Sequence, residues 1–185
     1  GDVYKRQMVR CLHQSGITVA HSFDIRERIS FYEKLCRSHG ALLFEDYEEV
    51  RGGMDWLMDT LDSMEHPKCL CHIDANVDNF LFFEDGSVKL LDWEYAGMCD
   101  PVMDVSMCAI YSYYNEEDME RLFRLYLQRE PSEDELFALY ANAALGGFLW
   151  CLWAVYKSIL GDEFGEYTII MYRYAKKYYR KLRKL

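Results

Sequence analysis

The 185-residue sequence lacks the features that would mark it as a membrane, secreted or repetitive protein. No apolar run comes near the roughly 20 residues of a membrane-spanning helix. The N-terminus has no charged-then-apolar secretory signal. There is no internal repeat, low-complexity tract or linker rich in proline and glycine. We therefore expect one folding unit with a hydrophobic core and no stable membrane insertion.

The seven cysteines are odd in number and scattered, which does not fit a disulfide framework. They indicate reduced thiols, several of them buried, in a cytoplasmic protein. The segment "CLCH" at 69–72 contains zinc-ligand residue types, but it lacks a second ligand pair, so we expect no zinc site there. Four histidines lie outside any cluster and are expected at the surface or at helix ends: His13, His21, His39 and His66.

The formal net charge of −10 argues against nucleic-acid binding over most of the surface. The final stretch, "RYAKKYYRKLRKL", is nevertheless strongly basic. The simpler interpretation is a last helix whose cations complement its own C-terminal dipole. A membrane-surface or acidic-partner role is the alternative. The oligomeric state is not indicated.

The first seven residues, "GDVYKRQ", do not resemble the rest of the chain. Residues 2–7 are what the codons GAT-GTG-TAT-AAG-AGA-CAG encode, which resembles the transposon end used in sequencing-library adaptors. We therefore exclude residues 1–7 from fold reasoning. We expect residues 8–185 to be a fragment, the C-terminal portion of a protein that begins further upstream.

The apolar periodicity predicts an α+β chain that is mostly α, with one small β-hairpin. "FLFF" and "VKLL" flank the turn "EDGS", which predicts pairing of 80–83 with 88–91. Everything from 102 onward has a helical pattern, and Ser132 with Glu135 forms a capping box. The predicted helices cover about 24–39, 46–65 (weakened by Gly52-Gly53), 135–160 and 166–184.

The polar loop "CHIDANVDN", at 71–79, leads into this hairpin. If Phe80 pairs with Leu91, then Asn79 and Asp92 lie opposite each other, and cross-strand neighbours are about 5 Å apart. Two oxygen ligands at that separation can bind a hard cation such as Mg²⁺. Asp74 lies on the loop and can reach the same region as a base. The alternative is a loop whose aspartates and asparagines only cap turns.

His-x-Asp-x-x-x-x-Asn, followed by a hairpin and a second Asp, is the residue set of phosphoryl transfer. In protein kinases the first Asp of such a set accepts the proton of the substrate hydroxyl, and the Asn and second Asp hold Mg²⁺. The metal neutralises charge on the phosphate oxygens of ATP. The pattern therefore favours an ATP-dependent phosphotransferase.

The stretch "HIDANVDNFLFFEDGSVKLLDWEYAGMCDPVMDVS", at 72–106, resembles the choline/ethanolamine kinase family within the aminoglycoside-phosphotransferase-like group. The pieces Asp-Trp-Glu-Tyr-Ala-Gly and Asp-Pro-x-x-Asp are similar to bacterial choline kinases. The likeness continues through "VRCLHQSGI", "LGGFLWCLWAVYK" and "YRYAKKYY". The resemblance implies the C-terminal lobe of a protein-kinase-like fold, whose parent transfers the ATP γ-phosphate to choline and makes phosphocholine.

By position, the resemblance implies Asp74 as the catalytic base and His72 as the residue that keeps the catalytic loop in shape. Asp104 is implied to anchor that loop by hydrogen bonds, as a structural residue. The implied magnesium ligands, the first two of which also serve the nucleotide, are Asn79, Asp92 and Glu94.

Trp150 and Trp153 lie three residues apart on one face of a helix. By itself this spacing is typical of core aromatics. Enzymes of the choline kinase family, however, carry a W-x-x-W pair that forms walls for the quaternary ammonium, which the faces of tryptophan attract. The resemblance therefore implies that Trp150 and Trp153 bind the substrate, with Tyr174 as a third wall.

The chain departs from the family pattern in two respects. Tyr111 stands where animal choline kinases carry a substrate-facing glutamate, so ethanolamine, another small amino alcohol or an aminoglycoside-like compound is an alternative substrate. No glycine-rich phosphate loop or strand lysine precedes the motif, whereas the family places both in an N-terminal lobe. We therefore expect the isolated chain to be inactive. A non-catalytic choline-binding module is the remaining alternative.

Overall fold

The computed structural model of the protein describes residues 2–41 and 44–184, so Gly1 of the adaptor-like segment lies outside the described residues. The chain divides into two compact units. The first unit comprises Gly1–Phe23 and His66–Asn142, and the second comprises Asp24–Glu65 and Ala143–Leu185. The loop of the phosphotransfer motif lies in the first unit, and the tryptophan pair lies in the second.

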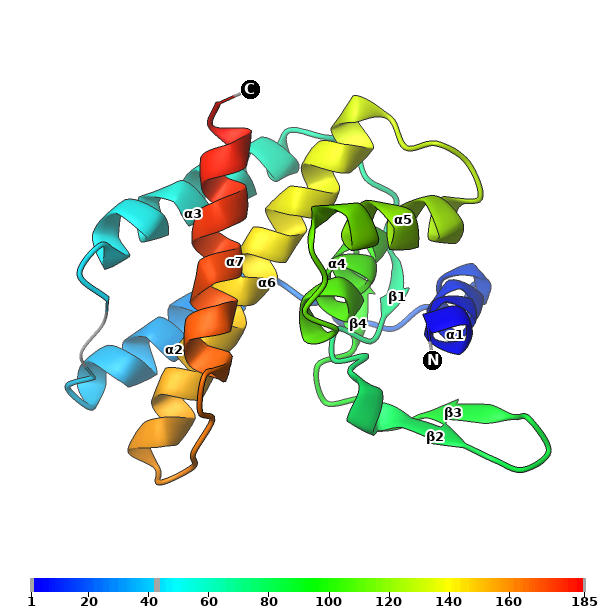
Figure 1. The fold of residues 1–185 in the computed structure, drawn as a ribbon, viewed down its shortest axis with the longest axis horizontal. Coiled ribbons are helices and arrows are strands. Elements are labelled where there is room, and N and C mark those ends of the chain that lie inside the picture. Colours follow the sequence, from blue (N-terminus) through cyan, green and yellow to red (C-terminus); the bar gives the residue numbers. More distant parts are fainter. Residues whose placement is uncertain (1, 42–43, 185) are drawn as a thin grey trace. The chain divides into compact units, whose positions relative to one another are not determined.

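The first unit combines helices with two small antiparallel sheets (Figure 1). Strand β1 pairs with β4, and β2 pairs with β3. Helix α1 packs against β1, α4 and α5. The elements of this unit are α1 (Asp2–Gln14), β1 (Cys69–Cys71), the 3-10 helix η1 (Val77–Asn79), β2 (Phe80–Phe82), β3 (Val88–Leu90), β4 (Gly97–Cys99), α4 (Pro101–Tyr111), α5 (Glu116–Leu127) and the start of α6 (Glu133–Ile159).

The predicted hairpin is present as β2 and β3, but its register differs by one residue from the prediction. Phe80 pairs with Leu90 and not with Leu91. The cause is the turn, which closes over three residues: the Phe83 N–H donates to the Ser87 carbonyl over 3.0 Å, and Gly86 takes the left-handed conformation at φ 80°. The prediction treated "EDGS" as a four-residue turn, and one residue of turn shifts every cross-strand pair.

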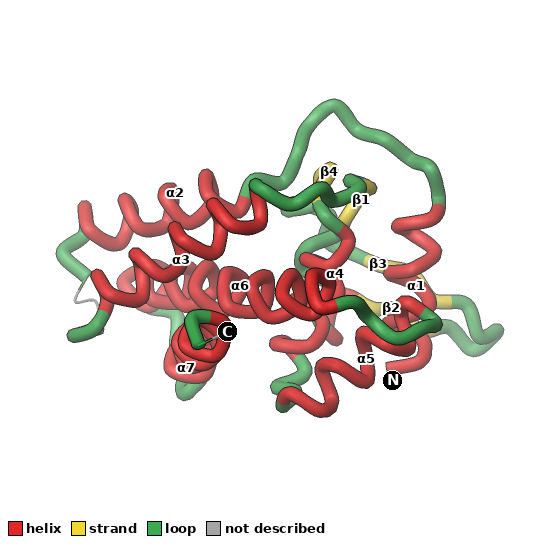
Figure 2. Tube along the Cα trace, turned by 90° about the horizontal axis from the view of Figure 1, so that it is seen from above, coloured by secondary structure: helices red, strands yellow, loops and turns green. Residues whose placement is uncertain are grey.

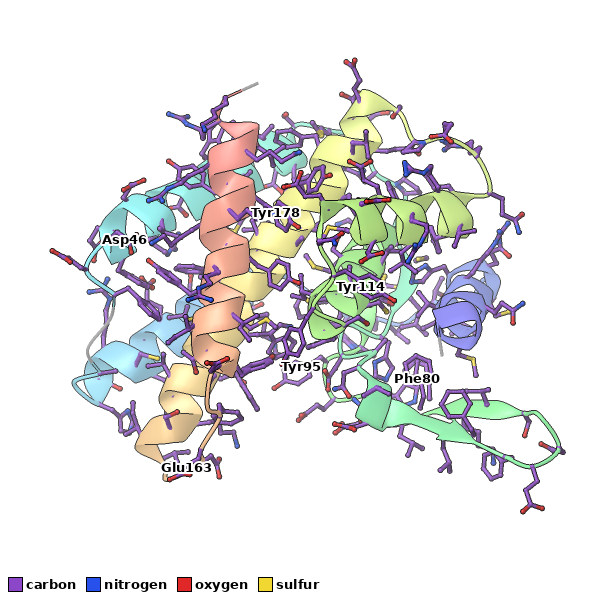
Figure 3. All side chains as sticks on the ribbon, viewed as in Figure 1. Asp46, Phe80, Tyr95, Tyr114, Glu163 and Tyr178 are labelled. Carbon is purple, nitrogen blue, oxygen red and sulfur yellow. The ribbon has the colours of Figure 1, made fainter. Side chains whose placement is uncertain are left out.

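Phe80 joins this hairpin to the rest of the first unit. Figure 3 shows it at the base of the hairpin, and only 6% of its surface is exposed. The next two residues of β2, Leu81 and Phe82, are exposed. The buried base therefore fixes the end of the hairpin that adjoins the polar loop.

The sheet of β1 and β4 was not predicted, and Figure 2 shows these two short strands side by side. Each strand has only three residues, too few for an alternating pattern to stand out. Gly97 is required in β4, because a Cβ there would lie 2.7 Å from the backbone nitrogen of Phe23. This sheet carries the chain directly into the polar loop at His72.

The second unit is helical, and its predicted helices are confirmed to within three residues at each end. Asp24 caps its first helix by accepting hydrogen bonds from the backbone N–H groups of Arg26 and Glu27. Helix α3 packs against α7 (Figure 1). The elements are α2 (Ile25–Ser38), α3 (Tyr47–Asp62), the remainder of α6, and α7 (Tyr167–Leu182).

Two glycines allow close packing in the second unit. A Cβ at Gly53 of α3 would lie 2.5 Å from the ring of Tyr179, and a Cβ at Gly147 of α6 would lie 2.5 Å from the carbonyl oxygen of Met171. The Gly52-Gly53 pair, which weakened the prediction of a helix at 46–65, therefore belongs to a continuous helix. Glycine lowers the helix propensity at position 53, but because it has no side chain the helix can contact the ring of Tyr179 there.

Helix α6 begins at the predicted capping box. The Glu135 N–H donates to Ser132 Oγ over 3.2 Å, and the Ser132 N–H donates to Glu135 Oε2 over 2.8 Å. A hydrogen bond from Arg129 is the main reason that the pKa of Glu135 falls to about 2. By length and composition alone this helix could span a membrane, contrary to the expectation that no apolar run is long enough. Within the protein, 83% of its most apolar window is buried, as a core helix requires.

Candidate active site

Asp104 is the most buried carboxylate of the motif, with 0% of its surface exposed. It lies in the first turn of α4, whose N-cap is Asp100. Its oxygens accept hydrogen bonds from the backbone N–H groups of His72, over 2.8 Å, and Ile73, over 2.5 Å. They also accept one from His13 Nε2 over 2.9 Å. Asp104 thus connects three segments that are far apart in the sequence.

The backbone of Ile73 is strained at the point where Asp104 holds it. Ile73 is fully buried and has φ 73°, a left-handed value that β-branched residues rarely adopt. Such a conformation costs about 1–3 kcal/mol and persists only where surrounding contacts fix it. The hydrogen bonds from His72 and Ile73 to Asp104 are contacts of this kind. The strained residue immediately precedes Asp74.

The half-buried carboxylate of Asp74 is held by two amide side chains. Asn76 Nδ2 donates to Oδ1 over 2.9 Å, and Asn79 Nδ2 donates to Oδ2 over 2.9 Å. Asn79 Nδ2 also donates to the backbone carbonyl of Asp74 over 2.8 Å. The structure thus brings Asp74 and Asn79 together, with their side chains in direct contact.

Asn76 was not among the predicted site residues. Its Nδ2 orients Asp74, and its Oδ1 accepts a hydrogen bond from the Asp78 N–H over 2.8 Å, which caps η1. The 3-10 turn then places Asn79 at the start of β2. An asparagine two residues after the motif aspartate was the only sequence signal, and it is equally typical of an ordinary turn.

His72 connects the loop to the end of the hairpin. It is fully buried, and its Nε2 donates to the carbonyl oxygen of Leu91 over 2.8 Å. Its ring meets that of Trp93 edge-on, with centroids 4.8 Å apart. Its Nδ1 has no hydrogen-bond partner among the described residues. This placement fits a residue that supports the loop.

Asp92 and Glu94 follow the hairpin and are exposed. Because of the register, Leu91 and not Asp92 faces Asn79: the Leu91 N–H donates to the Asn79 carbonyl over 2.8 Å. The predicted direct pairing of Asn79 with Asp92 is therefore wrong. Asp92 is the next residue along the chain, and its φ of 57° turns the backbone away from the strand direction.

No cationic partner of these carboxylates is found where side chains are described. Over residues 7–41 and 44–184, no lysine or arginine forms an ion pair with Asp74, Asp92 or Glu94. Both hydrogen bonds of the Asn79 amide use Nδ2, which leaves Oδ1 as its oxygen ligand. Carboxylate and amide oxygens are the ligands that Mg²⁺ prefers, so the residues present fit a magnesium ion.

Two of the histidines expected at the surface or at helix ends make contacts that were not predicted: His13, in the last turn of α1, is in a buried contact, and His66 is half-buried. The side chain of His13 is 4% exposed and bonds to Asp104. His66 Nδ1 lies 3.2 Å from Asp100 Oδ2. Burial raises the pKa of Asp100, while a hydrogen bond from Val102 and the charge of His66 lower it. Local spacing could not reveal contacts across such long stretches of chain.

Trp150 and Trp153 meet each other in the second unit. Their ring centroids are 6.1 Å apart at an angle of 89°, so the two indoles form a corner. Trp150 is buried and Trp153 is half-buried, with the Lys157 ammonium 5.9 Å from the Trp153 ring. Tyr174 is buried and stacks on Tyr178 with centroids 5.9 Å apart. Trp153 therefore already has a cation beside its ring.

Comparison with known proteins shows similarity to a phosphotransferase family and to kinases within it. The sequence pattern of the phosphotransferase enzyme family matches residues 10–140. The chain is 23% identical to Protein LicA of Haemophilus influenzae over 167 residues, covering 85% of this chain and 48% of LicA. It is 26% identical to ethanolamine kinase 1 of Mus musculus over 151 residues, covering 66% of this chain and 42% of that kinase.

Among solved structures, choline kinase LicA from Streptococcus pneumoniae superposes with a TM-score of 0.79 at 27% identity, covering 95% of this chain and 62% of that one. LicA in complex with AMP superposes with a TM-score of 0.83. The resemblance found in the sequence is thereby confirmed. The chain spans about half the length of the two curated proteins named above.

Replacing Asp104 with alanine tests the hydrogen bonds that hold the loop. The change leaves two buried backbone N–H groups and the His13 imidazole without an acceptor, and each unsatisfied buried donor costs about 1–3 kcal/mol. We expect Asp104→Ala to lower the free energy of unfolding by at least about 3 kcal/mol, measured by urea denaturation. The control is Asp78→Ala, an exposed carboxylate of the same loop, expected to change it by less than about 0.5 kcal/mol. Equal stabilities for the two variants would contradict this assignment.

Proposed function

The chain belongs to the phosphotransferase enzyme family, and we propose that it is the catalytic lobe of a kinase that transfers the γ-phosphate of ATP to the hydroxyl of choline, producing phosphocholine. The observation that carries this proposal is the contact between Asp74 and Asn79 at the start of the hairpin. A general base and a metal-binding oxygen are the two groups that phosphoryl transfer to an alcohol needs side by side.

Asp74 is the proposed base. Its two oxygens each accept a hydrogen bond from an amide, which fixes the direction of the carboxylate without neutralising it. In the proposed reaction the choline oxygen forms a bond to the γ-phosphorus, the bond from that phosphorus to the β-phosphate oxygen breaks, and the hydroxyl proton passes to Asp74. His72 and Asp104 act on this step only by positioning the loop.

We assign the binding of the metal ion and ATP to residues that follow Asp74 in the sequence. We propose that Asn79 Oδ1 and Asp92 hold Mg²⁺ with its ATP, and that Glu94 assists there. The exposure of Asp92 and Glu94 and their lack of cationic partners among the described residues support this assignment. When bound, the ion would neutralise charge on the phosphate oxygens.

The choline head group is assigned to Trp150 and Trp153, with Tyr174 as a third wall. The two indoles meet edge to face at 89°, and of the two only Trp153 has appreciable exposed surface. Tryptophan faces attract quaternary ammonium groups. The Lys157 ammonium lies 5.9 Å from the Trp153 ring, and a bound head group would have to displace this cation–π contact.

Ethanolamine is the second candidate substrate, and the similarity to ethanolamine kinase 1 of Mus musculus favours keeping it. Tyr111, where animal choline kinases carry a glutamate, also allows for a different amino alcohol. We propose that the complete, cytoplasmic protein adds an N-terminal lobe that binds the phosphates. On this proposal the isolated chain is inactive.

The role of Asp74 is tested in the protein encoded by the complete gene. We expect Asp74→Asn to lower kcat by about 10²–10⁴-fold, the usual contribution of a general base, with little change in choline KM. The matched control is Asp78→Asn, four residues along the same loop, for which kcat should stay near the wild-type value. Phosphocholine formation by ³¹P NMR is the measurement. A kcat for Asp74→Asn equal to that of the control would rule out Asp74 as the base.

The aromatic cage is tested by Trp153→Leu in the same protein. Loss of a partly desolvated cation–π contact of about 1–2 kcal/mol should raise choline KM by about tenfold. Trp56→Leu is the matched control, because Trp56 is also half-buried and has the Arg183 guanidinium 5.0 Å from its ring. An unchanged KM for Trp153→Leu would contradict the cage. A wild-type kcat/KM that is higher for ethanolamine than for choline would favour the second candidate.

A further inference from the structure

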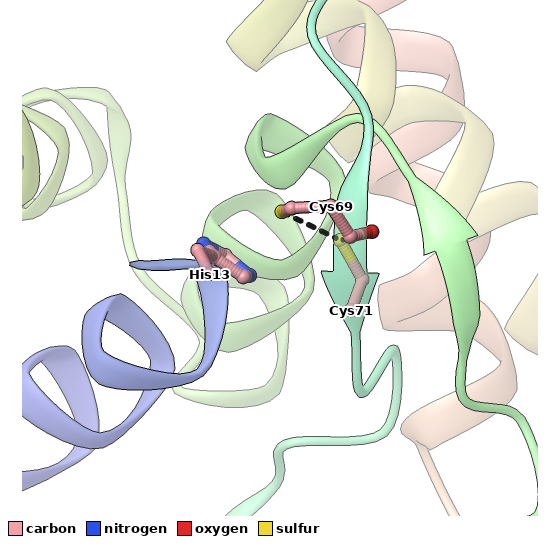
Figure 4. A group of neighbouring side chains, drawn as sticks. All are labelled: His13, Cys69 and Cys71. Atoms are coloured by element: carbon pink, nitrogen blue, oxygen red, sulfur yellow. Dashed lines mark hydrogen bonds between the residues drawn. The ribbon is translucent and has the colours of Figure 1, made fainter. Parts of the chain in front are cut away.

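A second group of ligand-type side chains lies in the first unit, apart from the residues assigned to phosphoryl transfer. Figure 4 shows His13 of α1 facing Cys69 and Cys71 of β1. One donor atom from each of the three residues lies within 4.8 Å of the other two. His13 and Cys69 are half-buried, and Cys71 is buried. The proposed function uses none of these three side chains.

The separation of the two sulfurs fits a tetrahedral zinc ion. Cys69 and Cys71 are two residues apart on one strand, so their side chains point to the same face. Their Sγ atoms are 3.8 Å apart. Two thiolates bonded to Zn²⁺ at about 2.3 Å in tetrahedral geometry are also about 3.8 Å apart. Little movement of these sulfurs is needed to bind the ion.

His13 is held in the tautomer that a metal ligand requires. The Asp104 carboxylate can only accept, so His13 Nε2, 2.9 Å from Oδ2, carries the proton. In the neutral imidazole the lone pair is then on Nδ1, which lies 2.7 Å from the Tyr126 hydroxyl, and a bound metal ion would replace that hydrogen bond. In zinc sites, the histidine nitrogen that does not bind the metal commonly donates a hydrogen bond to a carboxylate.

A third cysteine lies across the sheet. Cys99 of β4 pairs directly with Cys69, and side chains of paired residues project to the same face, about 5 Å apart. Cys71 Sγ lies 3.5 Å from the Cys99 carbonyl oxygen. Rotation of the Cys99 side chain would complete a Cys₃His ligand set, one of the common structural zinc sets.

We propose that His13, Cys69 and Cys71, completed by Cys99, bind one Zn²⁺. The ion would fasten α1 to the β1–β4 sheet, directly before the loop that begins at His72. The absence of a second ligand pair beside "CLCH" led to the expectation of no zinc site, but the further ligands come from distant segments. Because an ion that binds only the folded state adds its binding free energy to stability, zinc should also stabilise this chain.

The test uses the reduced, metal-free 185-residue chain titrated with Co²⁺ and then with Zn²⁺. We expect a single equivalent of Co²⁺ to give tetrahedral d–d bands and thiolate-to-cobalt charge transfer, and Zn²⁺ to displace it. Cys69→Ser should weaken binding at least about 100-fold, since loss of even an outer-shell partner costs 10–100-fold. Cys11→Ser is the matched control, because Cys11 is an exposed thiol of the same α1 and should leave the spectrum unchanged.

His13→Gln is the second variant, used if Cys69→Ser does not fold as judged by circular dichroism, and it should weaken binding in the same way. Zinc should raise the thermal midpoint of the wild type and of Cys11→Ser, but not that of the ligand variants. The proposal is overturned if the wild type gives no tetrahedral cobalt–thiolate spectrum. It is equally overturned if the spectrum survives in both ligand variants, or if Cys11→Ser abolishes it.

Discussion

The interaction on which the first unit depends is the set of hydrogen bonds to the buried carboxylate of Asp104. It joins α4, on which Asp104 lies, to α1 through His13 and to the polar loop through the backbone of His72 and Ile73. Burying an isolated carboxylate costs free energy of folding, but this carboxylate accepts hydrogen bonds from three donors. The same bonds hold Ile73 in a left-handed conformation that would otherwise relax.

The geometry of the candidate active site follows from that anchor. With Ile73 fixed, the next residue presents its carboxylate to the amides of Asn76 and Asn79. His72 also holds the segment that follows β3, by donating to the carbonyl oxygen of Leu91, one residue before Asp92. The base and Asn79 are thus positioned by hydrogen bonds that involve both backbone and side-chain groups. For phosphoryl transfer this matters, because positioning and electrostatics account for most of the catalysis.

The sequence was informative where structure depends on local pattern. Apolar periodicity predicted α2, α3, α6 and α7, the Ser132 capping box was found as expected, and the five-residue spacing brought Asp74 and Asn79 into contact. The predicted hairpin register was wrong because the composition of a turn does not reveal whether it closes over three residues or four. The burial of His13 against Asp104 was missed because a contact between such distant segments leaves no trace in local spacing.

Hydrogen exchange at the backbone amides of His72 and Ile73 tests the central claim most directly. If Asp104 fixes the loop, both amides should be strongly protected in the wild type and exchange much faster in Asp104→Asn, while amides inside α5 keep their protection. Rapid exchange of the two amides in the wild type, or equal protection in the variant, would contradict the account.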